Sequence, residues 1–235
     1  MFSHFLKYLS LYKRKIKYKK ISYSFNAVDL IIDYIFKDKI NGFYIDIGAQ
    51  HPIANNNTYL FFKRGWTGIN IDLDVKNIEL FNISRPNDIN LNNAISSSTS
   101  KKKLFFYHDK SPINTLVEDV SNFQNATVKE IKTVKTITLN KVLENLSFDK
   151  EIDYMNIDVE GHELDVLKGF DLIRYKPNVI SVEYLDLKMK YLEFKNNDLS
   201  RVIDSDFYKL LIKNDYQFVN WLHGDLIFVH NSFRD

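Results

Sequence analysis

The sequence predicts an α/β domain built on a mostly parallel seven-stranded sheet, with helices on both faces and an antiparallel hairpin at its end. Short runs rich in β-branched residues alternate with helical runs, as parallel βαβ units require. The last two strand-like runs are separated only by His223-Gly224, which is typical of a hairpin. Acidic residues also recur where the predicted parallel strands end. We expect a single domain over residues 25–235, preceded by a basic helical segment at 1–24.

The predicted elements follow one another in a regular order along the chain. The seven strands are predicted at residues 43–48, 67–72, 88–96, 152–159, 178–183, 216–222 and 225–230. The helices are predicted at residues 25–40, 58–63, 75–84, 141–146, 162–169 and 207–212. Between them we expect a polar turn at 96–103, an additional strand at 104–107, and extended chain at 136–139. Residues 109–130 are interpreted as an irregular loop or a lid.

Composition and charge exclude several classes of protein. The chain of 235 residues has no cysteine, which excludes disulfides, cysteine-ligated zinc and a thiolate nucleophile, and fits a reducing cytoplasm. Seven of its 32 Lys and Arg residues lie in the first 20 positions, which hold no acid. The rest of the chain therefore carries 25 basic and 30 acidic side chains. Because a general nucleic-acid binder needs a basic face on the folded domain, we expect no nucleic acid as a partner.

The first 20 residues form a basic amphipathic pattern. Phe2, Phe5, Leu6 and Leu9 recur at helical spacing, with Lys and Arg following, and no apolar stretch reaches the length of a signal peptide or membrane span. Two interpretations stay open. The helix lies on an anionic membrane surface or a partner, which would place the chain at the inner face of the membrane. Alternatively, it is a solvated helix packed loosely on its own domain.

Four acids are predicted at the carboxyl ends of parallel strands, namely Asp46, Asp72, Asp158 and Glu183. In an open parallel sheet, ligands bind in the crevice beyond these ends. If the strands at 152–159 and 178–183 are neighbours, Asp158 and Glu183 end roughly 5 Å apart. Their oxygen atoms then suit Mg²⁺ or Mn²⁺, which would lower the pKa of an acceptor hydroxyl. The alternative is that Glu183 binds the acceptor or a backbone group.

The first two strand ends suit a nucleoside ligand. Asp46 is followed by Gly48 and Ala49, which let the backbone approach a ligand closely. A dinucleotide site needs further glycines to hold a pyrophosphate, so a nucleoside without phosphates fits this turn better. Asp72 follows Gly48 by about 24 residues, a spacing at which an acid accepts hydrogen bonds from a ribose. Asp74 is the nearby substitute, and helix capping is the structural alternative.

The segment from Asn156 to Glu163 carries the strongest chemical signal. It brings Asp158, Glu160, His162 and Glu163 together within six residues, where the acids would repel one another if they were simply buried. Capping of the next helix accounts for Glu160 or Glu163, but not for Asp158 at the strand end. We therefore treat all four as candidate catalytic residues.

Three stretches together resemble a known family. They are Phe43-Tyr44-Ile45-Asp46-Ile47-Gly48-Ala49, Gly65-Trp66-Thr67-Gly68-Ile69-Asn70-Ile71-Asp72, and Ile157-Asp158-Val159-Glu160-Gly161-His162-Glu163 with Leu167-Lys168-Gly169. From about residue 42 to 184 the chain resembles the FkbM-type methyltransferases. The resemblance implies a Rossmann-like class I methyltransferase fold and S-adenosylmethionine as methyl donor. It also implies a hydroxyl acceptor, often on a sugar, so we expect a small-molecule or glycan acceptor, as in surface glycan biosynthesis.

The resemblance also implies roles for individual residues. Those expected at the donor are Asp46, Gly48 and Ala49 on the methionine side, Asp72 at the ribose, Asn93 near the adenine, and Asn57, Thr58 and Asp158 as further contacts. The chain departs from the family after Ala49, where Gln50-His51-Pro52 stands in place of a frequent Asn and second Gly. It also has Asn156 where Lys is frequent.

Methyl transfer to a hydroxyl requires help, because a protonated hydroxyl is a poor nucleophile. Either Glu160, His162 or Glu163 acts as general base, or a metal ion held by Asp158 and Glu183 assists. Two other functions compete with methyl transfer. One is a nicotinamide-dependent oxidoreductase on the same sheet type, which the missing glycines disfavour. The other is a non-catalytic domain that binds a partner through its N-terminal helix. The sequence does not predict the oligomeric state.

Overall fold

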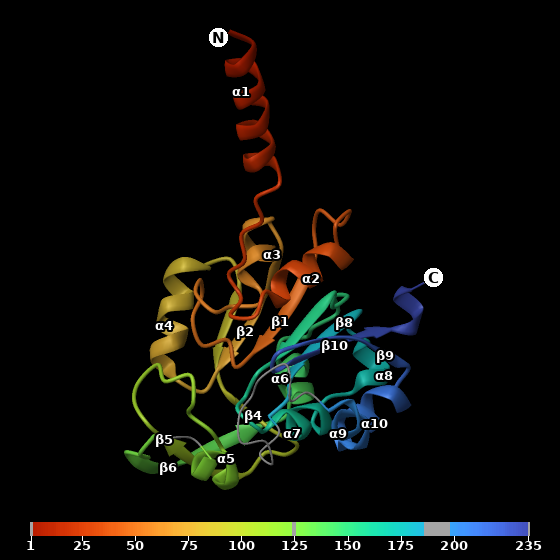
Figure 1. The fold of residues 1–235 in the computed structure, drawn as a ribbon. Coiled ribbons are helices and arrows are strands. Elements are labelled where there is room, and N and C mark those ends of the chain that lie inside the picture. Colours follow the sequence, from red (N-terminus) through yellow and green to blue (C-terminus); the bar gives the residue numbers. More distant parts are fainter. Residues whose placement is uncertain (1, 124–125, 186–197, 235) are drawn as a thin grey trace.

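A computed structural model describes residues 2–123, 126–185 and 198–234. Its main sheet has seven strands in the order β3-β2-β1-β7-β8-β10-β9. Their bounds are β1 Phe43–Ile47, β2 Thr67–Asp72, β3 Ile89–Asn92, β7 Tyr154–Ile157, β8 Val179–Glu183, β9 Tyr216–Leu222 and β10 Asp225–His230. The predicted seven-stranded, mostly parallel sheet is therefore confirmed (Figure 1).

In the main sheet, the neighbouring strands β3, β2, β1, β7 and β8 run parallel, and the C-terminal hairpin of β9 and β10 adds the antiparallel part. Ile47 pairs with Ile71 of β2 on one side and with Ile157 of β7 on the other, so the central strands end level with one another. β8 continues this register, with Ile157 opposite Val182. β10 runs antiparallel to β8 and β9, as predicted for the hairpin. Because β10 runs in the opposite direction, it begins at the edge where β8 ends.

Helices cover both faces of the sheet (Figure 1). Alternation along β1 sends Ile45 to one face and Tyr44 to the other, and both side chains are fully buried. On the Tyr44 face lie α2 (Val28–Ile35), α3 (Tyr59–Lys63) and α4 (Val75–Ser84). On the Ile45 face lie α6 (Leu139–Asn145), α7 (Glu163–Lys168) and α10 (Asp206–Lys213). Three further helical segments follow in the C-terminal part of the chain, namely α8 Leu172–Tyr175, α9 Leu199–Asp204 and the 3-10 turn η2 Asn231–Phe233.

The middle of the chain forms a second, smaller sheet. It contains β4 (Ala94–Ile95), β6 (Glu130–Ile137) and β5 (Lys101–Phe106), in that order. The prediction of one strand over 88–96 is therefore wrong, because the chain leaves the main sheet after Asn92 and joins the small sheet at Ala94. The predicted turn at 96–103 is wrong at its end, since three lysines begin β5. The loop predicted at 109–130 contains α5 (Glu118–Phe123).

The first helix, α1 (Phe2–Lys17), stands away from the rest of the molecule (Figure 1). Its described side chains are exposed, apart from the half-buried Leu9. The helix that the sequence predicts is therefore present, but it does not bury an apolar face against its own domain. Within the described ranges, no helix has both the length and the apolar character that crossing a membrane requires.

Candidate functional site

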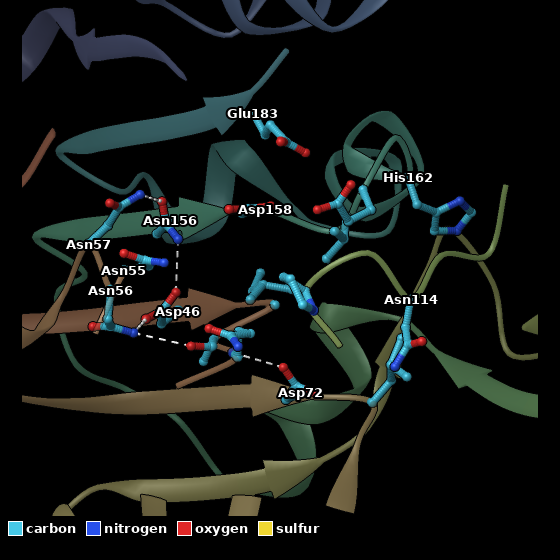
Figure 2. A pocket seen from close by; sticks show the side chains of 18 of the residues that line it. Asp46, Asn55, Asn56, Asn57, Asp72, Asn114, Asn156, Asp158, His162 and Glu183 are labelled. Atoms are coloured by element: carbon cyan, nitrogen blue, oxygen red, sulfur yellow. Dashed lines mark hydrogen bonds between the residues drawn. The ribbon is translucent and has the colours of Figure 1, made fainter. Parts of the chain in front are cut away.

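A cavity of about 460 Å³ opens at the edge where the parallel strands end (Figure 2). Its walls come from the ends of β1, β2, β7 and β8, from the loops that follow them, and from the turn of the β9–β10 hairpin. This volume lies in the range of small-molecule and cofactor sites. Most of the predicted site residues line the cavity, namely Asp46, Gly48, Ala49, Asn57, Asp72, Asn93, Asp158, Glu160, His162 and Glu183.

Gly48 is required by the close approach of two strand exits. Its φ of +80° lies in the left-handed region, and a Cβ placed there would lie 1.7 Å from the backbone oxygen of Asp158. The sequence predicts that this glycine leaves space for a ligand. The structure shows that its missing side chain also lets the chain after β7 pack directly against the turn after β1.

Asp46 is fully satisfied by protein donors. One carboxylate oxygen accepts a hydrogen bond from Asn156 at 2.9 Å (Figure 2). The other accepts from Asn56 at 3.0 Å and from the Thr58 hydroxyl at 2.8 Å. Burial raises the pKa of Asp46, while these hydrogen bonds and the charge of Arg85 act in the opposite direction. Asp46 thus ties the loop at 50–58 to the sheet.

Thr58 and Arg85 complete this support behind the cavity wall. Thr58 is fully buried and is absent from the cavity lining, so its observed role is to bind Asp46 and Arg85. The guanidinium of Arg85 donates to the carbonyl oxygen of Pro52 and to Asn56. The whole side chain is buried. A loop without regular structure is thereby fixed at several points.

Asn156 links the first and fourth parallel strands. Its amide donates to Asp46, and its oxygen accepts from Asn57 at 2.9 Å and from the Ser181 hydroxyl at 2.6 Å. The residue that departs from the family pattern is therefore a hydrogen-bonding centre of the site. Asn57 lies on the cavity wall and also accepts a hydrogen bond from Ser24.

Asp72 ends β2 and holds the loops on either side of it. Its carboxylate accepts from the backbone N–H of Gln50 at 2.8 Å and of Asp74 at 2.7 Å. Burial raises the pKa of Asp72 to about 6 despite these hydrogen bonds. Asp74 provides the N-cap of α4 by accepting from Lys76, so the capping role belongs to Asp74. Asn93 lies beside Asp72, since its N–H donates to the Asp72 carbonyl at 3.0 Å.

Asp158, Glu160 and Glu183 form a cluster of carboxylates, called here the acid cluster. The register places Asp158 next to Glu183, directly after the Ile157 and Val182 pair (Figure 2). One oxygen from each of the three side chains lies within 4.8 Å of the others. Burial, and then the charge of Glu160, raise the pKa of Asp158 well above its ordinary value. Burial and then Asp158 do the same for the pKa of Glu183.

The chain turns sharply after Asp158, so the strand predicted over 152–159 ends earlier than expected. β7 ends at Ile157, and Glu160 and Gly161 both adopt left-handed backbone angles, with φ of 55° and 90°. Glu163 stabilises this turn because one of its oxygens accepts from the N–H groups of Val159 and Gly161, both at 3.0 Å. Glu163 does not line the cavity. Burial raises its pKa to about 7.

His162 lies on the cavity wall with both ring nitrogens engaged. Nε2 is 3.0 Å from the Ser96 hydroxyl, and Nδ1 is 3.3 Å from an oxygen of Asp165. Burial lowers the pKa of His162, and the charge of Asp165 partly offsets that effect. A general base needs a free nitrogen toward its substrate. The geometry therefore favours the acid cluster over His162 and Glu163 as the proton acceptor.

Sequence reasoning missed several residues of the cavity. Asp225 is buried at the start of β10, opposite Glu183, and burial raises its pKa to about 6. The signal was present, because the first residue of an antiparallel last strand must lie at the edge where the parallel strands end. Phe25 and Asn26 also reach the cavity, beside His223, although their segment precedes the first strand. No motif marked them.

Comparison with known proteins adds a family to this geometry. Among curated proteins, no relative matches the sequence. The FkbM methyltransferase domain matches residues 46–216, which is more than half of the chain. The match includes the carboxyl ends of all five parallel strands of the main sheet. The matched region contains Asp72, Asp158 and Glu183. The chain therefore belongs to the FkbM methyltransferase family.

Proposed function

We propose that this protein transfers a methyl group from S-adenosylmethionine to a hydroxyl group of a sugar or sugar-containing metabolite. The observation that carries the proposal is the division of one cavity into two chemically different ends. The β1 and β2 end offers Asp72 and Asn93, whereas the β7 and β8 end offers the acid cluster. The strand order, with its antiparallel last hairpin, supports a Rossmann-like class I methyltransferase fold.

The donor end fits a nucleoside. Asp72 is held rigidly at a strand end by two backbone N–H groups, and a carboxylate oxygen has further lone pairs to accept ribose hydroxyls. Asn93 and Ala94 lie beyond Asp72, where the family resemblance expects the adenine. S-adenosylmethionine supplies a methyl group that is activated by a positively charged sulfur. An acidic cavity suits such a cation.

A dinucleotide fits this cavity less well. A pyrophosphate is usually bound by the N-terminus of the helix that directly follows the first strand. Here residues 49–58 form an irregular loop, and α3 begins only at Tyr59. The cavity wall along this loop carries Asp46 and asparagines, which do not favour a phosphate, and Arg85 lies behind the wall with its guanidinium bound to the loop. This observation favours methyl transfer over nicotinamide chemistry.

The acceptor end combines carboxylates with an aromatic face. Asp225 and Glu183 lie opposite each other on β10 and β8. Phe25 is 74% exposed, and its ring centroid lies 6.4 Å from that of His223. Carboxylates accept hydrogen bonds from sugar hydroxyls, and an aromatic ring packs against the apolar face of a sugar ring. This pairing supports a saccharide acceptor.

The acid cluster supplies the proton acceptor. Asp158 and Glu160 lie on the cavity wall. Burial, and then repulsion from Glu160, raise the pKa of Asp158, so it holds a proton more strongly than an ordinary carboxyl does. As the acceptor oxygen forms its bond to the methyl carbon, the bond from that carbon to the sulfonium breaks and S-adenosylhomocysteine leaves. The hydroxyl proton passes to a carboxylate of this cluster. Positioning of the hydroxyl between these oxygens supplies the remaining assistance.

Calorimetry with S-adenosylmethionine and with NAD⁺ tests the donor. We expect saturable binding of S-adenosylmethionine and no binding of NAD⁺. Asp72→Ala should bind S-adenosylmethionine at least tenfold more weakly. Asp171→Ala, which removes an exposed helix N-cap that does not line the cavity, is the matched control and should bind normally. A second assay incubates the protein with sugar nucleotides and glycans and detects a mass gain of one methyl group. Binding of NAD⁺ instead, or of neither ligand, would refute the proposal.

A further inference from the structure

We propose that the acid cluster is a divalent-cation site, at which Mg²⁺ or Mn²⁺ positions the acceptor hydroxyl. This inference rests on the proposed function for its role in transfer, but the metal site itself is argued from the side chains alone. Three carboxylates from two strand ends and the turn after β7 converge here. Mg²⁺ and Mn²⁺ prefer such oxygen ligands.

The distances between the carboxylates suit one ion. The three candidate oxygens lie within 4.8 Å of one another. Adjacent ligands of an octahedral Mg²⁺ ion, each at about 2.1 Å, are roughly 3 Å apart, and opposite ligands are roughly 4 Å apart. Small rotations of the side chains would therefore close the cluster around a cation. The open side of the cavity leaves room for water and for an acceptor oxygen as further ligands.

Glu183 provides a second, independent observation. Its Oε2 atom is buried and has no hydrogen-bond partner among the residues that the structure describes. A buried carboxylate oxygen without a donor is costly, and native proteins rarely leave one in that state. Figure 2 shows the Glu183 carboxylate directed toward the region that Asp158 also faces. A bound cation would satisfy this orphaned oxygen.

The charges around the cluster also call for a cation. Neither Asp158 nor Glu183 forms an ion pair with a Lys or Arg in the described part of the chain. The charges that act on Asp158 most strongly after burial are those of Glu160 and Asp225, both negative. Asp46 shows the contrast, because amide, hydroxyl and guanidinium groups surround it. Among the residues that the structure describes, no Lys or Arg neutralises Asp158 or Glu183, and a bound metal ion would do so.

Titration with Mn²⁺ alone, followed by electron paramagnetic resonance of the free ion, tests the site without a donor or acceptor. We expect one saturable site in the full-length protein, with at least tenfold weaker binding in Glu183→Gln and Asp158→Asn. Glu144→Gln, an exposed acid on α6, is the matched control and should bind like the original protein. Both cluster variants lose repulsion, so thermal unfolding should show them folded.

The possible results separate the metal site from the proposed function. No saturable Mn²⁺ site, or unchanged binding in Glu183→Gln, would overturn the metal site and favour a proton shared by the two carboxyls. Calorimetry with S-adenosylmethionine in EDTA then tests the function by itself. Donor binding with no Mn²⁺ site leaves the methyltransferase intact, and a Mn²⁺ site without donor binding refutes the function but keeps the metal.

A separate observation concerns α1, for which we propose binding to an anionic lipid surface. Phe5, Leu9, Tyr12 and Ile16 follow one another at spacings of four and three residues and so form one stripe along the helix. Three of them are more than half exposed, at 57% for Phe5, 52% for Tyr12 and 59% for Ile16. Such a stripe normally faces a core or another surface.

The charge of α1 indicates which surface it meets. The segment up to Lys20 has seven Lys and Arg residues and no acid. Lys7 and Arg14 lie on the side opposite the apolar stripe, and Lys13, Lys15 and Lys17 flank it. A basic face combined with aromatic and aliphatic side chains suits an anionic membrane interface. A second copy of the helix would instead bring like charges together.

Flotation with lipid vesicles tests this binding. The full-length protein should float with phosphatidylcholine vesicles that contain phosphatidylglycerol, and not with phosphatidylcholine alone. The triple variant Lys13→Gln, Arg14→Gln and Lys15→Gln should bind at least tenfold more weakly. The control removes three exposed charges from the small sheet by Lys101→Gln, Lys103→Gln and Lys135→Gln. Equal flotation of both variants, or a dimer that depends on α1 in light scattering, would overturn the proposal.

Discussion

Two groups of acids lie at the same edge of the sheet, and their surroundings are opposite. Asp46, on β1, receives three side-chain hydrogen bonds and lies near the guanidinium of Arg85. Asp158, after β7, is surrounded mainly by other carboxylates. The two positions are only one strand apart. Position at a strand end therefore does not decide what an acid does there.

The difference assigns distinct tasks to the two groups. A carboxylate whose oxygens are occupied by protein donors holds the chain in place, and its loss costs stability. A carboxylate among like charges lowers stability and is retained where it serves a ligand or a reaction. Asp46 belongs to the first kind and the acid cluster to the second. Substitutions at the two sites should therefore give opposite results.

The largest effect is expected for Asp158→Asn. Turnover should fall by about 100-fold or more, because proton transfer in the transition state typically contributes 10²–10⁴-fold. The free energy of unfolding should stay constant or rise, since the substitution removes one negative charge from the cluster. Methyl-transfer kinetics and urea unfolding measure the two quantities. A variant that is active, or one that is strongly destabilised, would place Asp158 with Asp46 instead.

Gly48→Ala tests the contact between the two strand exits and should mainly affect stability. Its Cβ would meet the Asp158 backbone oxygen, which cannot move without displacing β7. We expect a loss of more than about 3 kcal/mol, from left-handed strain of 1–2 kcal/mol and the added clash. Gly65→Ala is the matched control, because its φ of +92° is strained in the same way but no atom lies within 4 Å. Equal losses in the two variants would show that the clash relaxes at no cost.

Asp46→Asn should cost about 2 kcal/mol of unfolding free energy with a smaller effect on chemistry. The new amide would face the donors of Asn56 and Thr58 where the carboxylate accepts from both, so at least one hydrogen bond is lost. Urea unfolding measures the loss of unfolding free energy, and calorimetry with S-adenosylmethionine measures whether the cavity still binds the donor. Asp46→Asn with unchanged stability but abolished donor binding would show that Asp46 contacts the ligand directly.

Sequence reasoning succeeded where a local pattern decides the structure. The strand Thr67–Asp72, the helix Val75–Ser84 and the final hairpin have the predicted bounds because their apolar periodicity and turn residues are clear. It failed at residues 88–96, where a break between two sheets leaves no mark in composition. The structural roles of Asp46 and Glu163 could not be predicted either, because the groups that donate hydrogen bonds to them lie in irregular loops and turns. The place of Asp225 in the site could be predicted only from the order of the strands, which puts it opposite Glu183.

The pH dependence of stability is a further test, and Glu163 isolates one part of it. Its folded pKa of about 7 lies above its ordinary value of 4.5, so the folded chain holds a proton that the unfolded chain releases. This contribution is complete below about pH 4.5 and is lost as the pH rises through 7, by at most about 1.4 kcal/mol per pH unit. Gln at this position keeps an oxygen for Val159 and Gly161 but does not titrate. In EDTA, urea unfolding between pH 5 and 7 should therefore show a shallower decline in Glu163→Gln than in the original protein. Parallel declines would mean that Glu163 is ionised in the folded chain and that the decline belongs to Asp158, Glu183 and their neighbours.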